Sequence, residues 1–237
     1  MRKIINDCEQ WLRAEVNNAH ASGIVLGLSG GIDSSVLAAL GREALGRESV
    51  LGVIMPCHSI DEDEADARLL AEAIDVNFIR VDLSGVFDSM LNAIGGDFNS
   101  LVKSNMKARL RMVTLYAVAQ SKNFLVCGTS NKSEFETGYF TKFGDSGVDL
   151  MPLANFLKRE IREIAKILNV PEKIITKAPS AGLYEGQTDE GDMGFSYDIL
   201  DEYLSTGKLS DAKARERIDV MRRRSEHKRK PIPIFKF

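Results

Sequence analysis

Residues 23–40, which read GIVLGLSGGIDSSVLAAL, constrain the fold more than any other part of the chain. Residues 24–28 are a short apolar run, which predicts a buried strand of a parallel sheet. The Ser-Gly-Gly turn at 29–31 has two adjacent glycines, which tolerate backbone conformations that a Cβ hinders. From Asp33 onward the apolar residues recur at helical spacing. A strand, a glycine turn and a helix start predict an anion site, because the free amides and the dipole of a helix N-terminus favour negative charge.

The loop differs from two common phosphate-binding motifs. A Walker loop places a lysine after its glycines, and no lysine follows them here. A Rossmann fingerprint requires a third glycine that Ser34 does not supply. The loop offers hydroxyls and amides for phosphate oxygens, and Asp33 offers a carboxylate for magnesium. A plain turn capped by Asp33 or Ser34 is the simpler alternative, although two adjacent glycines exceed what a cap needs.

Residues 29–35 resemble the pyrophosphate loop of the N-type ATP pyrophosphatases. This resemblance implies an enzyme that cleaves ATP between its α- and β-phosphates and adenylates a substrate. Several members of that superfamily share the loop, so the substrate has to be inferred from the rest of the chain.

Composition indicates one large cytoplasmic domain. The chain has 237 residues, of which 44% are hydrophobic, and no apolar run approaches the length of about 20 that spans a bilayer. The N-terminus lacks a secretory core and a cleavage site. Three widely spaced cysteines indicate neither a disulfide framework nor a zinc or iron–sulfur site. A net charge of −3 argues against a general nucleic-acid binder.

Strand and helix patterns alternate along the chain, which predicts an open, mostly parallel sheet with helices on both faces, a Rossmann-like α/β fold. Strands are expected at 24–28, 50–55, 77–82 and 123–128. Helices are expected at 3–20, from 33 onward, and at 61–74, 84–94, 99–121, 156–168, 196–204 and 210–224. Ligands of such sheets bind beyond the carboxyl ends of the strands. The loops at 29–35 and 128–134 should therefore share a cleft.

The segment 99–121 is the longest expected helix. Its apolar residues recur at spacings of four and three, which predicts that they form its packing face. These residues are Val102, Met106, Leu110, Val113 and Ala117. Asn105 and Arg109 are four residues apart and therefore share another face of the helix.

The loop 128–134 carries hydroxyls, an amide and an acid directly after a strand. Thr129 is a candidate to hold a nucleotide, and Glu134 is a candidate to hold a metal with Asp33. The alternative is a polar loop that caps the next helix. The following block, 138–145, mixes aromatic residues, a lysine and acids with glycines, which suits a flat, hydroxylated ligand.

The second half of the chain offers weaker signals. Lys158 can reach a phosphate, but a single lysine is usually solvated. Residues 177–190 are rich in turn formers and form either a surface excursion or a lid over the site. Residues 222–230 are strongly basic, and such runs are usually solvated.

Taken in order, these segments closely resemble the ammonia-dependent NAD synthetases, over essentially the whole chain. The matching blocks are 29–35, 105–111, 128–134, 138–145, 152–168, 179–183, 187–190 and 227–228. The resemblance implies an adenine nucleotide α-hydrolase type of fold. It implies that ATP contacts Gly27, Leu28, Ser29, Gly30, Gly31, Ile32, Asp33, Ser34, Thr129, Lys158 and Ser180. It further implies that Asp33 and Glu134 are the catalytic carboxylates and bind Mg²⁺, and that Arg109, Lys142, Asp149, His227 and Lys228 contact deamido-NAD.

The implied activity is that of a ligase, which amidates deamido-NAD with ammonia to give NAD and releases AMP and pyrophosphate. Relatives that use glutamine carry a large added amidase domain, and we expect residues 1–237 to form one NAD synthetase domain without it. The resemblance also implies a homodimer with the dinucleotide site near its interface.

Three rival functions remain at this point. Another pyrophosphate-loop ligase, such as the synthetase part of GMP synthetase, fits the loop but not the blocks at 138–145 and 187–190. A tRNA-thiolating relative would have paired cysteines. A nucleotide-binding module without catalysis would not need both Asp33 and Glu134, and an ATP turnover assay distinguishes it.

Overall fold

In the residues that the computed structural model describes, 1–180, 186 and 188–237, four parallel strands form one sheet in the order β3-β2-β1-β4. These strands are β1 (Gly23–Gly27), β2 (Val50–Ile54), β3 (Asn77–Arg80) and β4 (Phe124–Val126). The predicted α/β fold with a parallel sheet is therefore confirmed, and each strand lies within a residue or two of its expected position. Because β1 lies between β2 and β4, the loop that follows it opens at the middle of the carboxyl edge of the sheet.

The central strand is buried on both faces. Val25 of β1 lies opposite Leu51 of β2 and Val126 of β4. Ile24 and Leu26 point to one face of the sheet, and Val25 points to the other, as the alternation of side chains along a strand requires. This double burial explains why β1 reads as a continuous apolar run instead of an alternating one.

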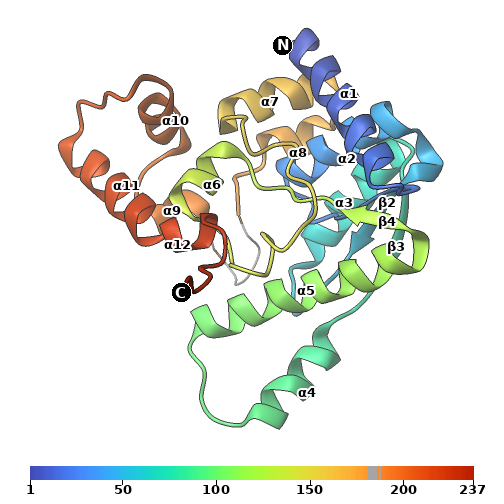
Figure 1. Cartoon of the computed structure of the whole chain (residues 1–237), viewed down its shortest axis with the longest axis horizontal. Helices are drawn as coiled ribbons and strands as arrows, with labels where there is room; N and C mark the ends of the chain where they lie inside the picture. The colour runs from blue at the N-terminus through green and yellow to red at the C-terminus, as the bar shows by residue number, and fades with distance from the viewer. Residues whose placement is uncertain (181–185, 187) are drawn as a thin grey trace.

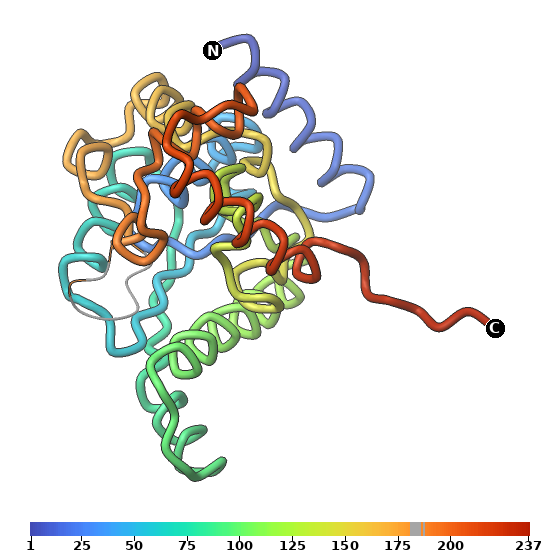
Figure 2. Tube along the Cα trace, turned by 90° about the vertical axis from the view of Figure 1, so that its left-hand side faces the viewer, coloured from blue at the N-terminus to red at the C-terminus, as the bar shows by residue number. Residues whose placement is uncertain are grey.

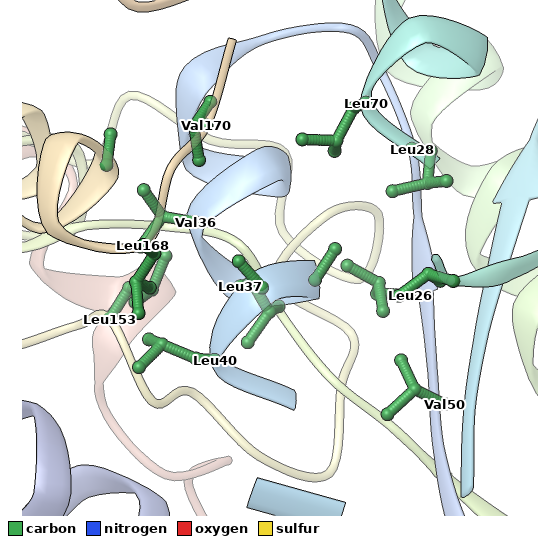
Figure 3. Close-up of a cluster of buried hydrophobic side chains, with 14 of the residues drawn as sticks. Leu26, Leu28, Val36, Leu37, Leu40, Val50, Leu70, Leu153, Leu168 and Val170 are labelled. Carbon is green, nitrogen blue, oxygen red and sulfur yellow. The ribbon is translucent and has the colours of Figure 1, made fainter. Parts of the chain in front are cut away.

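Two layers of helices cover the sheet (Figure 1). One layer contains α1 (Arg2–Asn18), α2 (Ile32–Leu45), α3 (Asp61–Ala73), α7 (Lys158–Ile167) and α8 (Glu172–Thr176). Its core is shown in Figure 3, where Leu37 and Leu40 of α2 lie between Leu26 and Val50 on one side and Leu153 and Leu168 on the other. The other layer is formed by α4 (Ser84–Ile94) and α5 (Ser100–Lys122), which pack through Phe87, Leu115 and Ala119.

The remaining helices follow β4 or lie near the C-terminus. They are α6 (Lys132–Thr137), α9 (Asp189–Met193), α10 (Tyr197–Thr206), α11 (Ala212–Arg224) and α12 (Glu226–Arg229), and a short 3₁₀ turn, η1 (Arg47–Ser49), precedes β2. Met193, Tyr197, Leu200 and Ile218 form a small core of their own. Figure 1 shows this group to one side of the sheet, and Figure 2 shows the last residues extending away from the body. No helix in the described part of the chain is long and apolar enough to span a membrane.

The prediction for the packing face of α5 was only partly right: Met106 and Leu110 are half-buried and pack against the core, but the other three residues do not. Val102 and Val113 are 38% and 59% exposed, and Ala117 is exposed as well. The buried side carries Ser104 and Ala119, with Lys107, Ala108 and Leu115. Small side chains let α5 lie close against the sheet, so the helix packs through them. Helical spacing identifies an apolar stripe, but it does not reveal whether this chain covers the stripe.

Candidate active site

The loop after β1 is held by its own hydroxyls at the start of α2. The Ser34 hydroxyl donates to the Gly31 carbonyl at 2.9 Å, and the Gly31 N–H donates to Ser29 Oγ at 3.2 Å. Gly30 has φ of +77°, and a Cβ there would lie 2.4 Å from the Asp63 carbonyl oxygen of α3. Gly31 is the N-cap of α2 and receives no side-chain cap, so neither Asp33 nor Ser34 caps the helix as the simpler alternative required. The first-turn amides of α2 therefore face the loop as a helix N-terminus that suits an anion.

Asp33, in the first turn of α2, meets the loop that follows β4. Asn131 Nδ2 donates to Asp33 Oδ1 at 2.7 Å, and Asn131 is fully buried. Asn131 also caps α6, because its Oδ1 accepts from the Glu134 N–H while Glu134 Oε2 accepts from the Asn131 N–H. The two interpretations of this loop are therefore compatible: it caps the next helix, and it brings Glu134 to the edge of the sheet where Asp33 lies.

Lys158, the first residue of α7, lies between the two carboxylates. Its Nζ is 2.5 Å from Asp33 Oδ2 and 3.1 Å from Glu134 Oε1, and the side chain is 2% exposed. The start of α7 is fixed from α10, because the carboxylate of Asp201 accepts from the Arg159 N–H at 2.8 Å and from the Ser133 hydroxyl at 2.6 Å. The solvated alternative for Lys158 is wrong, because its ammonium is buried and paired.

Two residues that sequence analysis did not name individually complete this centre, although Asp189 lies within the block at 187–190. The hydroxyl of Tyr197 lies 2.8 Å from Asp189 Oδ2 and 3.2 Å from Glu134 Oε1. The Tyr197 ring is 4.7 Å from the Lys158 ammonium, a cation–π distance. Asp189 is 4% exposed, and its second oxygen is buried without a hydrogen-bond partner among the described residues. Residue spacing gives no signal for this pair, whereas the three-residue spacing of Asn131 and Glu134 is the signature of a capping box.

Electrostatics in this centre shift several pKa values. The pKa of Glu134 is raised to about 7, chiefly because the carboxyl group is buried. The Lys158 ammonium opposes this shift, whereas the charges of Asp33 and Asp189 add to it. Burial also raises the pKa of Asp189. For Lys158, burial works to lower the pKa, but the neighbouring carboxylates of Asp33 and Glu134 outweigh it and raise the pKa. Three carboxylates thus share one ammonium in a poorly solvated space.

The donor atoms of this centre fit a hard divalent cation. Mg²⁺ prefers carboxylate oxygens and is usually held by one or two carboxylates together with substrate phosphates. Asp33 and Glu134 supply such oxygens beside the start of α2, and the buried oxygen of Asp189 lies in the same centre without a hydrogen-bond partner among the described residues. The set is therefore suited to a metal that also contacts the phosphates of a nucleotide.

A second cluster joins four of the five residues predicted to contact deamido-NAD. Arg109 of α5 donates to the Lys142 carbonyl at 3.3 Å, and Lys142 Nζ donates to the His227 carbonyl at 2.9 Å. Lys228 Nζ donates to the carbonyls of Gly138 and Phe140 at 2.8 and 2.7 Å. Arg109 is exposed, so the cluster presents positive charge at the surface. The basic C-terminal run is therefore only partly solvated, because Lys228 holds main-chain oxygens.

Asp149 lies apart from that cluster. Its Oδ1 accepts from the Tyr116 hydroxyl at 3.0 Å, and its Oδ2 accepts from the Val126 N–H at 2.7 Å. Tyr116 is seven residues along α5 from Arg109, which corresponds to about 10 Å of helix. In this structure Asp149 anchors the end of the 138–149 loop to β4, and its predicted contact with deamido-NAD stays a prediction.

The other residues predicted to contact ATP lie around the loop. Leu28 and Ile32 are buried in the core, so only their main-chain atoms are placed to face a ligand. Thr129 lies three residues after the end of β4 and is half-buried, and Ser180 is exposed. Pro179 is near the centre, because its carbonyl accepts from the Asp189 N–H at 3.0 Å. Parts of the 177–190 segment and of the blocks at 179–183 and 187–190, namely 181–185 and 187, lie outside the described residues.

Comparisons with known proteins show similarity over nearly the whole chain. The chain matches the family model described as NAD synthase over residues 4–232. The NH(3)-dependent NAD(+) synthetase of Finegoldia magna is 49% identical over 99% of this chain and 96% of its own length.

Two solved structures are similar along their full length. NMN synthetase from Francisella tularensis is 40% identical, with a TM-score of 0.95 over 100% of this chain and 98% of that chain. NH3-dependent NAD synthetase from Campylobacter jejuni is 30% identical, with a TM-score of 0.85 over 99% of each chain. The similarity therefore extends well beyond the phosphate loop.

Proposed function

This chain belongs to the NAD synthase family, and from that membership we propose that it is a ligase that amidates deamido-NAD with ammonia at the expense of ATP. One structural observation supports the proposed activity independently of family membership. The chain combines a Ser-Gly-Gly helix start with Asp33, Glu134 and Lys158, whose charged groups meet beside it. A binding module without catalysis has no use for two carboxylates at this place.

The reaction has two steps. The nicotinate carboxylate of deamido-NAD attacks the α-phosphate of ATP, and pyrophosphate leaves. Ammonia then attacks the adenylated carbonyl carbon, and AMP leaves as NAD forms. No side chain has to act as a covalent nucleophile, so the protein contributes position and charge neutralisation.

The loop at 29–34 and the start of α2 are suited to hold the β- and γ-phosphates as one unit. The glycines let the chain approach the phosphates closely, and the helix dipole favours their charge. Lys158 enters the same space from α7 and would neutralise part of that charge. With the pyrophosphate unit anchored, the α-phosphate is left open to the attacking carboxylate.

Magnesium is the metal that we propose for Asp33 and Glu134. When bound, it would stabilise the negative charge on the departing pyrophosphate. Asn131 and Tyr197 orient the two carboxylates through the hydrogen bonds described above. These contacts let the chain hold both acids in place at the edge of the sheet.

The deamido-NAD end of the site is proposed at the basic cluster formed by Arg109, Lys142, His227 and Lys228. Helix α6 connects it to the carboxylate centre, because Glu134 lies in its first turn and Gly138 follows its last. A run of six residues spans about 9 Å. The two ends of α6 thus separate the phosphates of ATP from the phosphates of the second substrate.

A second candidate substrate is nicotinate mononucleotide. The observation that favours it is the TM-score of 0.95 to NMN synthetase from Francisella tularensis, against 0.85 for the NAD synthetase from Campylobacter jejuni. Nicotinate mononucleotide carries the same reactive carboxylate but lacks the adenosine phosphate half. Relatives nearer in sequence, at 49% identity, are called NAD(+) synthetases, and we therefore retain deamido-NAD as the principal substrate.

The deciding experiment supplies ATP, Mg²⁺, ammonium and either deamido-NAD or nicotinate mononucleotide to the purified protein. We expect NAD to form, with a kcat/KM for deamido-NAD at least about tenfold above that for the mononucleotide, because an extra phosphate-bearing half adds binding energy. A preference for the mononucleotide would reassign the substrate. Absence of product from both would refute the proposed activity.

We also propose that residues 1–237 act as one NAD synthetase unit and that two copies form a homodimer. The unit is supported by Tyr197 and Asp201 of α10, which bond to groups on α6 and α7. The dimer is supported by apolar side chains at the surface of α4 and of α5, where Val86, Ile94, Leu101 and Val113 are each more than half exposed. Unpartnered apolar faces of this kind mark interaction surfaces, and two-fold dimers are the commonest soluble assembly.

A further inference from the structure

The ammonium of Lys158 occupies the space between the two carboxylates that we assign to magnesium. Its Nζ contacts Asp33 Oδ2 at 2.5 Å and Glu134 Oε1 at 3.1 Å, and the residue is 1% exposed. A dication coordinated by both acids would compete with this ammonium for the same oxygens. The lysine and the metal are therefore alternative partners of Asp33 and Glu134.

Neighbouring residues show why a lysine is needed there without substrate. Asp189 contributes a third carboxylate, and its Oδ1 is buried and unpaired among the described residues. Removing buried carboxylates from water is costly unless a cation or hydrogen-bond donors compensate for the lost solvation. Lys158 is the cation that contacts both acids, and the Tyr197 ring 4.7 Å from Nζ supports it from another side.

We propose that Lys158 is an exchangeable internal cation. This proposal rests on the assignment of magnesium to Asp33 and Glu134 in the proposed function. Without ligands the lysine holds Asp33 and Glu134 together. When the metal takes these carboxylates, Lys158 turns to a phosphate group bound at the start of α2. Metal and phosphate then bind as a pair, and neither binds well alone.

The charge of the Lys158 ammonium explains why metal binding and anion binding are linked. A metal that binds alone leaves the Lys158 ammonium buried without its two anionic partners, which is strongly unfavourable. An anion at the helix start gives that ammonium a new partner and removes the penalty. By thermodynamic linkage, the anion must tighten metal binding by the same factor by which the metal tightens anion binding.

The test measures Mn²⁺ binding to the full chain without nucleotide, by electron paramagnetic resonance of the free ion. Sulfate serves as the anion probe, and chloride at equal ionic strength is the control. In the wild type we expect sulfate to tighten Mn²⁺ binding by about fivefold or more, within the usual range of coupling between two sites.

The variant Lys158→Met removes the competing ammonium. We expect it to bind Mn²⁺ about tenfold tighter than the wild type in chloride and to lose the sulfate effect, because its carboxylates retain no internal cation. Lys166→Met is the matched control, since Lys166 lies on the exposed side of α7, and it should behave as the wild type does. Circular dichroism establishes that each variant is folded.

The proposal is overturned if Lys158→Met binds Mn²⁺ no tighter than the wild type, or if sulfate has no effect on the wild type. The effect of sulfate on the wild type tests the proposal even if the Lys158→Met variant does not fold. If Mn²⁺ binding is equally strong in Asp33→Asn, the metal assignment fails and this proposal fails with it. NAD formation by the wild type is measured in a separate assay. If the exchange of Lys158 is refuted, the proposed ligase activity can therefore still be correct.

Discussion

The Nζ of Lys158 lies 2.5 Å from Oδ2 of Asp33, although 125 residues separate the two in the chain. This contact joins the start of α7 to the start of α2, and Glu134 at the start of α6 completes the group. Three helices thus begin at one place beyond the carboxyl edge of the sheet. Their N-termini and the buried ion pairs between them form the centre on which the following predictions depend.

The first prediction concerns the two carboxylates. Asp33→Asn and Glu134→Gln should each lower kcat by a factor on the order of 10²–10³, because each removes a carboxylate proposed to hold the magnesium that stabilises charge on the departing pyrophosphate. Asp198→Asn is a suitable control, since Asp198 lies on α10 with a side chain that is 85% exposed. Steady-state NAD formation by folded protein measures the effect. Near-normal turnover of both site variants contradicts the assignment.

The second prediction concerns pH. The pKa of Glu134 is about 7 in the folded protein, above its ordinary value of 4.5. Between these values the folded state binds more protons than the unfolded state, so the contribution of Glu134 to the free energy of unfolding falls as pH rises through this window. Without metal, the melting temperature of the wild type should therefore drop relative to that of Glu134→Gln between about pH 5 and about pH 8. Parallel curves for the two proteins would exclude the shift.

The third prediction concerns the nitrogen donor. Ammonium should support NAD formation by the isolated 237-residue chain, and glutamine freed of ammonia should not. The physical reason is that glutamine hydrolysis needs a reactive thiolate, whereas burial raises the pKa of the Cys8, Cys57 and Cys127 thiols. The assay measures NAD with each donor separately. Equal rates with the two donors would disprove the expectation.

The fourth prediction concerns assembly. Val113→Asp should convert a dimer into monomers, because it places a charge on the apolar stripe of α5 while leaving the buried face of the helix intact. Ile234→Asp is the control, since Ile234 is 81% exposed in the C-terminal tail. Light scattering coupled to gel filtration gives the mass of each protein. A wild type that is monomeric and fully active would rule out the dimer.

The fifth prediction concerns the bond that is broken. The loop has no Walker lysine to support a transferring γ-phosphoryl group, and its helix start suits an intact pyrophosphate unit. The products should be AMP and pyrophosphate. Without ammonia, labelled pyrophosphate should exchange into ATP in the presence of deamido-NAD, provided that the adenylation step is reversible. Stoichiometric ADP and orthophosphate, with phosphatases excluded, would show that the loop has been misread.

Sequence patterns predicted the sheet, the phosphate loop and the meeting of the loops after β1 and β4, because these depend on local periodicity and on the geometry of parallel sheets. They did not predict Tyr197 or Asp189. A tyrosine on an amphipathic helix reads as core, and only the tertiary packing of α10 reveals that its hydroxyl reaches Glu134. The face of α5 was partly misassigned for a related reason, since the small residues Ser104 and Ala108 that pack inward carry little hydrophobic signal.

The contacts of Asp33 also constrain the order in which a newly made chain becomes active. Asp33 is translated early, but Asn131 and Lys158 lie 98 and 125 residues further along. Contacts at such separations form slowly, because long loops must close first. On the ribosome the β1 strand and α2 can form long before Asp33 has a partner, and Glu134 gains its tyrosine contact only after residue 197 has emerged. The carboxylate centre is thus completed only late in synthesis.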